Sequence, residues 1–172
     1  MPHIKPIDPE QAEGEADKLF QTAKAAFGSI PEPLQLFAHN PKVANAVFDG
    51  FGPSMSQPTL SQPFFAWIRY LLASNTDCTH CVDVNGGMLL AMGVSQSDLL
   101  SGIENPASTP LPENEKALLL ACIKAVADRK TITKEEIDDL KKRGFSDSDL
   151  VTAFHHAVHT QATDILINTF GL

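Results

Sequence analysis

The chain has 172 residues, of which 43% are hydrophobic and 20% charged, a composition typical of one soluble globular domain with a sizeable core. Its formal net charge of −8, with only 13 Lys and Arg residues, argues against a nucleic-acid partner, which requires concentrated basic side chains. No stretch approaches the roughly 18 apolar residues that span a bilayer, and residues 1–6 lack the apolar core of a signal peptide. We therefore expect a cytoplasmic protein with no membrane partner.

The N-terminal part of the chain carries two local signals for helix starts. Asp8-Pro9-Glu10 combines an N-cap, a proline suited to the first helical position and an acid in the first turn, and Gly28 provides an end. Asn40-Pro41 repeats the cap and first-turn pattern. Apolar residues recur at helical spacing after both starts. The pattern predicts helices over residues 8–27, 33–39 and 41–51.

The middle of the chain is its most apolar part. Residues 60–75 predict an apolar helix, and a second helix follows from Cys78 to Met92, where Gly93 caps it. We expect these two helices to form the buried centre. Further helices are predicted over residues 113–129 and 133–143.

The predicted fold class is all-α. Val, Ile and Thr are nowhere arranged in the sustained alternation that indicates a strand. We expect a multi-helix bundle of about eight or nine helices, because each apolar segment has helical and not strand periodicity. It should form a single domain over residues 1–172, in which residues 1–30 supply an N-terminal helix and extension.

A short pattern occurs twice, 51 residues apart. Gly93–Leu99 reads GVSQSDL and Gly144–Leu150 reads GFSDSDL, so a glycine that ends one helix precedes a Ser-x-x-Asp variant of the capping box in both copies. Convergent helix capping explains such a pattern. The alternative is a duplicated helical hairpin, in which residues 60–92 correspond to residues 111–143.

The duplicated-hairpin interpretation has a chemical consequence. In the second copy Arg129 and Ile132 stand where the first copy has Cys78 and Cys81. Only the first copy could therefore carry out thiol chemistry.

The most informative segment for function is Cys78-Thr79-His80-Cys81, which follows a predicted helix start. Residues i and i+3 of a helix have Cβ atoms roughly 5–6 Å apart, and a tightened first turn approaches the roughly 3.8 Å of a disulfide. Backbone N–H groups at a helix start favour a thiolate, and His80 would lower a thiol pKa from about 8.5 toward neutrality. We therefore interpret Cys78 and Cys81, assisted by His80, as a redox-active catalytic dithiol. A half-site for zinc and two inert core thiols remain as alternatives.

A histidine cluster near the C-terminus offers a second possibility for metal binding. His155 and His159 are one helical turn apart and could share an ion, although packing or a subunit contact is the favoured role for these residues and His156. Zinc held by Cys78, Cys81 and two of these histidines would satisfy tetrahedral coordination. No sequence argument brings the two segments together.

Four further residues have chemistry to consider. Asp77 and Asp83 flank the cysteine motif, where a carboxylate raises a thiol pKa or, if protonated, serves as a proton relay; Asp77 is assigned as an N-cap. Arg69 could stabilise a thiolate, but we expect its charged end to reach solvent. Cys122 lies in an apolar run and is expected to be a small buried hydrophobe.

An apolar helix that leads into a Cys-x-x-Cys helix, followed by a Gly-x-Ser cap and a second helical hairpin, resembles the alkylhydroperoxidase D-like family of the carboxymuconolactone decarboxylase superfamily. The resemblance spans about Pro31 to Phe170, and the placement of the two cysteines is its specific part. The other matching segments are Asn40-Pro41, Leu60-Ser61, residues 74–81 and residues 93–95.

The resemblance implies a helical subunit that assembles into trimers or hexamers and acts as a peroxidase or disulfide reductase in antioxidant defence. Its cysteine pair maps onto Cys78 and Cys81. The substrate would be a hydroperoxide or a disulfide, and the electrons would come from an external dithiol, since the chain has no nucleotide-binding fingerprint and no cofactor is expected.

Two positions depart from the pattern of the family. Its peroxidatic members usually carry a histidine four residues after the second cysteine and a glutamate about twelve residues before the first, whereas this chain has Asn85 and Ala66 there. The usual proton relay is therefore missing, and we expect His80 to take over its task. The alternatives are a zinc-bound or non-catalytic oligomeric protein, and the decarboxylase activity of the superfamily, which uses no cysteine pair.

Overall fold

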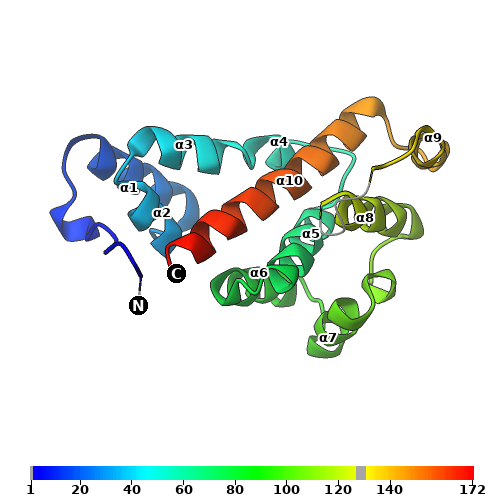
Figure 1. Cartoon of the computed structure of the whole chain (residues 1–172), viewed down its shortest axis with the longest axis horizontal. Coiled ribbons are helices and arrows are strands. Elements are labelled where there is room, and N and C mark those ends of the chain that lie inside the picture. Colours follow the sequence, from blue (N-terminus) through cyan, green and yellow to red (C-terminus); the bar gives the residue numbers. More distant parts are fainter. Residues whose placement is uncertain (1, 127–130) are drawn as a thin grey trace. The chain divides into compact units, whose positions relative to one another are not determined.

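The computed structural model describes residues 2–126 and 131–172. Within these residues the fold is all-helical, with 72% helix and no strand, which confirms the predicted class. The described residues form nine helices of six residues or more, a single-turn helix α4 and two short 3₁₀ turns (Figure 1). The helices are α1 (Gly14–Phe27), α2 (Glu32–Phe37), α3 (Pro41–Asp49), α4 (Gly52–Met55), α5 (Gln62–Asn75), α6 (Thr79–Ala91), α7 (Gln96–Glu104), α8 (Glu113–Val126), α9 (Lys134–Lys142) and α10 (Asp147–Thr169).

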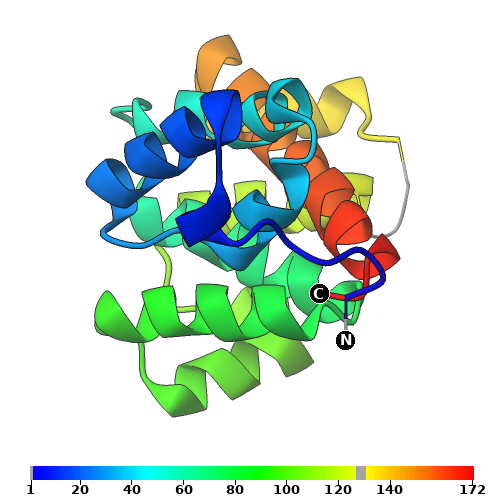
Figure 2. The ribbon, with the colours of Figure 1, turned by 90° about the vertical axis from the view of Figure 1, so that its left-hand side faces the viewer.

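The chain divides into two compact units, Met1–Gly50 with Leu166–Leu172, and Phe51–Ile165. The first unit contains α1, α2 and α3, with α3 packed on the other two helices. Its two chain ends lie side by side, as Figures 1 and 2 show, because the backbone N–H of His3 donates to the carbonyl of Phe170 over 2.7 Å. Across the described residues, no helix is both long and apolar enough to cross a membrane.

The first predicted helix is interrupted near its start. Asp8 caps only the 3₁₀ turn Pro9–Gln11, because the backbone becomes extended at Ala12 and ends that turn. Gly14, with φ of +62°, lets the chain turn again before α1 continues to the predicted end at Gly28. The prediction of one continuous helix from residue 8 was therefore wrong, whereas its C-terminal end was confirmed.

The second unit is built around α5, whose nine buried residues include Phe64, Trp67 and Leu72. Helix α6 runs along α5 and makes the most extensive contact between any two helices of the described chain. Only one side of α6 is buried, however, since Val84 and Met88 are exposed. The expectation of a buried centre was correct for α5 and wrong for the outer side of α6.

The duplicated pattern adopts the same geometry in both copies. Gly93 and Gly144 both have positive φ, of 92° and 102°. The hydroxyl of Ser95 then accepts the backbone N–H of Asp98 over 3.1 Å, and the hydroxyl of Ser146 accepts that of residue 149 over 3.2 Å. Each serine therefore caps the helix that follows it, α7 in the first copy and α10 in the second.

The helix boundaries favour the duplicated-hairpin interpretation. A shift of 51 residues carries the first residue of α5 onto the first residue of α8, and the first residue of α7 onto the first residue of α10. Arg129, which would correspond to Cys78, lies outside the described residues. The correspondence of the caps and of these helices supports two copies of one helical hairpin.

Candidate functional site

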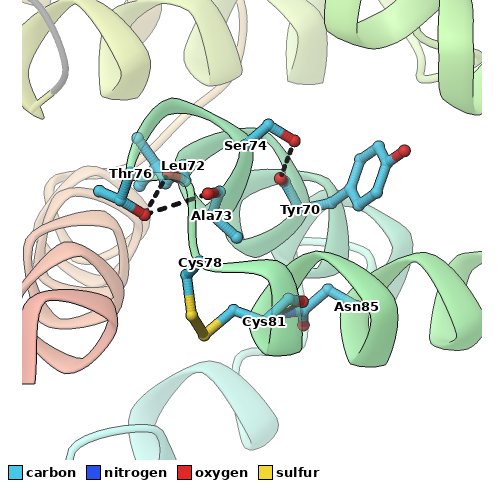
Figure 3. Close-up of a disulfide and its surroundings, with 8 residues drawn as sticks. All are labelled: Tyr70, Leu72, Ala73, Ser74, Thr76, Cys78, Cys81 and Asn85. Atoms are coloured by element: carbon cyan, nitrogen blue, oxygen red, sulfur yellow. Dashed lines mark hydrogen bonds between the residues drawn. A yellow bond between two sulfur atoms is a disulfide. The ribbon is translucent and has the colours of Figure 1, made fainter. Parts of the chain in front are cut away.

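The cysteine motif lies at the junction of α5 and α6. Helix α5 ends at Asn75, and Asp77 adopts a left-handed conformation with φ of +54°, which turns the chain back. The N–H of Cys78 donates to the carbonyl of Ala73 over 3.1 Å, and Cys78 then serves as the N-cap of α6 (Figure 3). This turn fixes the position at which the first cysteine enters the helix.

Asp77 does not cap α6 as predicted. The N-cap is Cys78, and no side chain accepts a hydrogen bond there. The physical reason is the left-handed backbone of residue 77, a conformation that aspartate tolerates better than most residues and that places it outside the helix.

Cys78 and Cys81 form a disulfide across the first turn of α6, with their Cα atoms 5.2 Å apart. The expected approach of the two sulfurs is thereby confirmed. Cys78 has no exposed surface and Cys81 is 5% exposed. When the bond is open, both sulfurs lie at a helix N-terminus, where the helix dipole favours a thiolate over a thiol.

Asn85 connects this turn to α5. It lies one turn beyond Cys81 on the same side of α6 (Figure 3). Its Nδ2 donates to the Cys81 carbonyl over 2.8 Å. Its Oδ1 accepts a hydrogen bond of 2.8 Å from Nε of Arg69. The Nη1 atom of Arg69 lies 3.3 Å from Nε2 of His156, and Nη2 lies 3.8 Å from the sulfur of Met88. The side chain of Asn85 therefore links Cys81 to the half-buried guanidinium of Arg69.

The guanidinium of Arg69 is held by neutral groups. Among the described residues, no carboxylate forms an ion pair with it, and burial lowers the pKa of Arg69 to about 10. The expectation that the charged end of Arg69 reaches solvent was only partly correct, because the residue is half-buried and Asn85 and His156 offer its guanidinium two acceptors. Ala66, where the family has a glutamate, is unexposed in the core.

His156 is part of the core. It is 1% exposed, and its ring lies 5.5 Å from that of Phe51 and 4.9 Å from that of Phe65, measured between centroids. Burial, followed by the charge of Arg69, lowers the pKa of His156 to about 3. The imidazole is therefore neutral at physiological pH and can accept a hydrogen bond from Arg69.

Asp164 on α10 is the residue that the sequence analysis missed. A carboxylate oxygen of Asp164 and the sulfurs of Cys78 and Cys81 all lie within 4.8 Å of one another. Asp164 is 4% exposed, and its Oδ2 has no hydrogen-bond partner among the described residues. Burial raises the pKa of this carboxyl to about 7.

A sequence signal for Asp164 does exist, although it is weak. Asp164 continues a buried stripe of α10 that contains Ala153, Ala157 and Thr160, spaced by three or four residues. A carboxylate in the register of a core-facing stripe is unusual, because an ionised group is costly to bury without a partner.

The predicted histidines do not join the sulfurs. His80 is half-buried and is not part of the group formed by the two cysteines and Asp164. The rings of His155 and His159 stack on each other at 5.7 Å, and His155 is exposed. The zinc site of two cysteines and two histidines is thus not assembled in the described part of the chain.

The third cysteine is isolated from this chemistry. Cys122 is unexposed in α8, and burial raises the pKa of its thiol. The prediction that Cys122 behaves as a small buried hydrophobic residue is confirmed.

Comparison with known proteins adds a distant relative. No protein-family model matches the chain. An alkyl hydroperoxide reductase of Mycobacterium tuberculosis is 24% identical over 110 residues, which is 63% of this chain and 32% of that protein. The chain therefore spans about a third of the length of this curated relative.

Solved structures show the fold more fully. The alkylhydroperoxidase D core of a peroxidase-related protein from Ralstonia eutropha has a TM-score of 0.84, with 16% identity over 99% of this chain and 90% of that one. A peroxidase-related protein from a Silicibacter species has a TM-score of 0.80, with 18% identity and coverages of 99% and 87%. A debrominase in complex with 2,3,4-tribromopyrrole has a TM-score of 0.74, with 16% identity and coverages of 97% and 88%. The chain therefore has the fold of these alkylhydroperoxidase D-core structures, which is the fold that the resemblance in its sequence implies.

Proposed function

We propose that this protein is a thiol-disulfide oxidoreductase with peroxidase-like activity, and that Cys78 and Cys81 are its redox centre. One observation carries the proposal: the two sulfurs form a disulfide at the N-terminus of α6, in a fold shared with peroxidase-related proteins. A helix start stabilises the thiolate that such chemistry needs. The substrate is a hydroperoxide or a disulfide, and an external dithiol supplies the electrons.

The exposed fractions of the two cysteine residues favour Cys81 as the attacking residue. Cys78 is completely enclosed, whereas Cys81 keeps a small exposed surface and lies inside the first turn of α6. The Cys81 thiolate attacks a hydroperoxide, so that the O–O bond breaks, a sulfenic acid forms, and the departing alkoxide takes a proton from solvent and leaves as an alcohol. The Cys78 sulfur then attacks the Cys81 sulfur, the disulfide forms and water leaves. An external dithiol reduces the disulfide by exchange.

The proposal is tested by hydroperoxide turnover with dithiothreitol as the electron donor. Cys81→Ser should abolish the reaction, and Cys78→Ser should stop it after one turnover, because the sulfenic acid then has no internal partner. Cys122→Ser is the matched control, since it removes a thiol from the core and should leave turnover unchanged. Equal rates in the wild type, Cys78→Ser and Cys81→Ser would overturn the proposal.

The alternative of a zinc-bound, non-catalytic protein has its own measurement. Thiolates that hold zinc are unavailable as nucleophiles, so one equivalent of zinc in the purified protein would contradict the redox proposal. Assembly into trimers or hexamers and a cytoplasmic location remain predictions. Light scattering coupled to size-exclusion chromatography would measure the first.

A further inference from the structure

We propose that Asp164 is the proton-transfer group of the Cys78–Cys81 pair: it holds a proton while the disulfide is closed and gives that proton to Cys78 when the disulfide opens. This inference rests on the proposed redox function of the pair and names the group that moves its proton. The residues involved come from two helices that are distant in the sequence, α6 and α10.

The first support is the position of the carboxyl group. An oxygen of Asp164 lies within 4.8 Å of both sulfurs, close enough for a proton to pass directly after a small rotation or through one bridging water. All three side chains are buried, so bulk solvent has little access to the sulfur that must gain or lose the proton. A local donor is therefore needed, above all for Cys78, which has no exposed surface.

The second support is the absence of a partner for the carboxyl group. The Oδ2 atom of Asp164 is buried and has no hydrogen bond among the described residues. A buried carboxylate without a partner is unfavourable, whereas the neutral acid is tolerated and carries a proton that it can donate. The environment of Asp164 thus favours the form that the closed disulfide requires.

The acidity of Asp164 suits this task. Burial raises its pKa to about 7, so both protonation states are accessible near neutral pH, where a proton-transfer group is most effective. Titratable or charged groups on the three helices that carry the site include Arg69 on α5, His80 and Asp83 on α6, and His155, His156 and His159 on α10. Burial is the cause of the shift, and none of these groups contributes to it.

The cycle balances as follows. A donor thiolate attacks the Cys81 sulfur, the disulfide bond breaks, and Cys78 leaves as a thiolate that takes the proton from Asp164. The second donor thiolate then releases Cys81 as a thiolate and becomes oxidised to the donor disulfide. After a hydroperoxide has oxidised Cys81 to the sulfenic acid, the Cys78 thiol returns its proton to the Asp164 carboxylate and attacks. The disulfide forms, and the departing hydroxide takes a proton from solvent.

The decisive experiment measures the two half-reactions separately, without peroxide turnover. Asp164→Asn keeps the size of the side chain but cannot exchange a proton, so reduction of the disulfide by dithiothreitol near pH 7 should slow by about tenfold or more. Closure of the reduced pair by oxidised dithiothreitol should slow similarly, and its dependence on pH near 7 should disappear. Asp83→Asn is the matched control, because it removes an exposed acid of α6 and should change neither rate. Equal rates for Asp164→Asn, Asp83→Asn and the wild type would overturn the inference.

A second measurement uses the wild type and does not depend on the folding of a variant. Infrared difference spectra between the oxidised and reduced protein near pH 7 should show the C=O stretch of a protonated carboxyl that is lost on reduction. A spectrum without this band would contradict the inference. If the pair opens and closes with the expected response to Asp164→Asn but hydroperoxides are not consumed, the peroxidase function fails and the assignment of Asp164 stands.

Discussion

Arg69 and Asn85 are joined by a hydrogen bond of 2.8 Å from Nε to Oδ1, and the same amide donates from Nδ2 to the carbonyl of Cys81. The Asn85 side chain thereby links the redox turn to α5, in addition to the backbone hydrogen bond from Cys78 to Ala73. Asn85 is a hydrogen-bond acceptor and a donor at once. A replacement that keeps only one of these roles therefore separates its effect on the stability of the protein from its effect on the pKa of the Cys81 thiol.

Asn85→Ala should lower the free energy of unfolding by about 1–2 kcal/mol, because it leaves the half-buried guanidinium of Arg69 with one acceptor fewer. Asn85→Asp should lose less than about 1 kcal/mol, since its carboxylate pairs with Arg69, but its charge should raise the pKa of the Cys81 thiol. Urea unfolding measures the first effect, and alkylation of the reduced protein as a function of pH measures the second. If Asn85→Asp were as unstable as Asn85→Ala, this account would be contradicted.

The low pKa of His156 predicts a loss of stability in acid. The unfolded chain binds a proton at this residue below about pH 6.5, whereas the native imidazole binds one only near 3, so the stability present above pH 6.5 is lost as the pH falls toward 3. His156→Gln removes the proton site and keeps an acceptor for Arg69. Between about pH 7.5 and pH 4.5 the wild type should lose roughly 2–3 kcal/mol more than this variant.

The control for this measurement is His155→Gln. His155 is exposed, so its replacement should leave the difference between the two pH values unchanged. Denaturant unfolding at both pH values gives the comparison. An equal loss for the wild type and His156→Gln would show that His156 is charged in the folded protein.

The aspartates of the two duplicated caps, Asp98 and Asp149, differ in their other hydrogen bonds. Asp98 caps α7 at the surface, whereas Asp149 is 2% exposed and also accepts hydrogen bonds from Gln57 and Thr59. Burial acts to raise the pKa of Asp149, but the hydrogen bonds from Ser146, Thr59 and Gln57 outweigh it and hold the pKa below its usual value. Asp149→Ala should therefore cost about 3 kcal/mol and Asp98→Ala about 1 kcal/mol in thermal or urea unfolding. Similar losses of stability in the two variants would mean that the hydrogen bonds from Gln57 and Thr59 to Asp149 do not stabilise the protein.

Two glycines on neighbouring helices predict opposite effects of the same substitution. A Cβ at Gly102 would lie 2.5 Å from Cζ3 of Trp67, an unexposed ring with no room to move, whereas a Cβ at Gly87 would meet nothing within 4 Å. Gly102→Ala should destabilise the protein by about 1–3 kcal/mol through overpacking, and Gly87→Ala should stabilise it by about 0.5–1 kcal/mol through helix propensity. Melting temperatures that move in the same direction would refute the steric argument.

The features that the sequence predicted are those that short segments determine. Asn40, Ser95 and Ser146 cap their helices through atoms three residues away, so the starts of α3, α7 and α10 follow from local pattern. The pairing of Cys78 with Cys81 is local for the same reason. Even local signals are ambiguous, however, since the cap at Asp8 suits the observed 3₁₀ turn as well as a long helix.

The features that the sequence did not predict depend on packing between helices. Arg69 was assigned to solvent because an arginine among apolar neighbours usually extends outward, but α6 and α10 bring Asn85 and His156 to it. Asp164 has no spacing relative to the cysteines that a motif could express. His80 lies within the motif but is not part of the group that Asp164 forms with the two sulfurs, so its role in proton transfer stays a prediction.

Because Cys122 is buried in α8, the oxidation state of the Cys78–Cys81 pair can be measured by thiol labelling of the intact protein. Of the three cysteine sulfurs, that of Cys122 should not react with thiol reagents in the native protein, so the number of labels incorporated counts only Cys78 and Cys81. A mass difference of two hydrogens between the oxidised and the reduced protein can then be assigned to the Cys78–Cys81 disulfide without peptide mapping. The titration of that bond against a thiol buffer would yield its redox potential from intact protein alone.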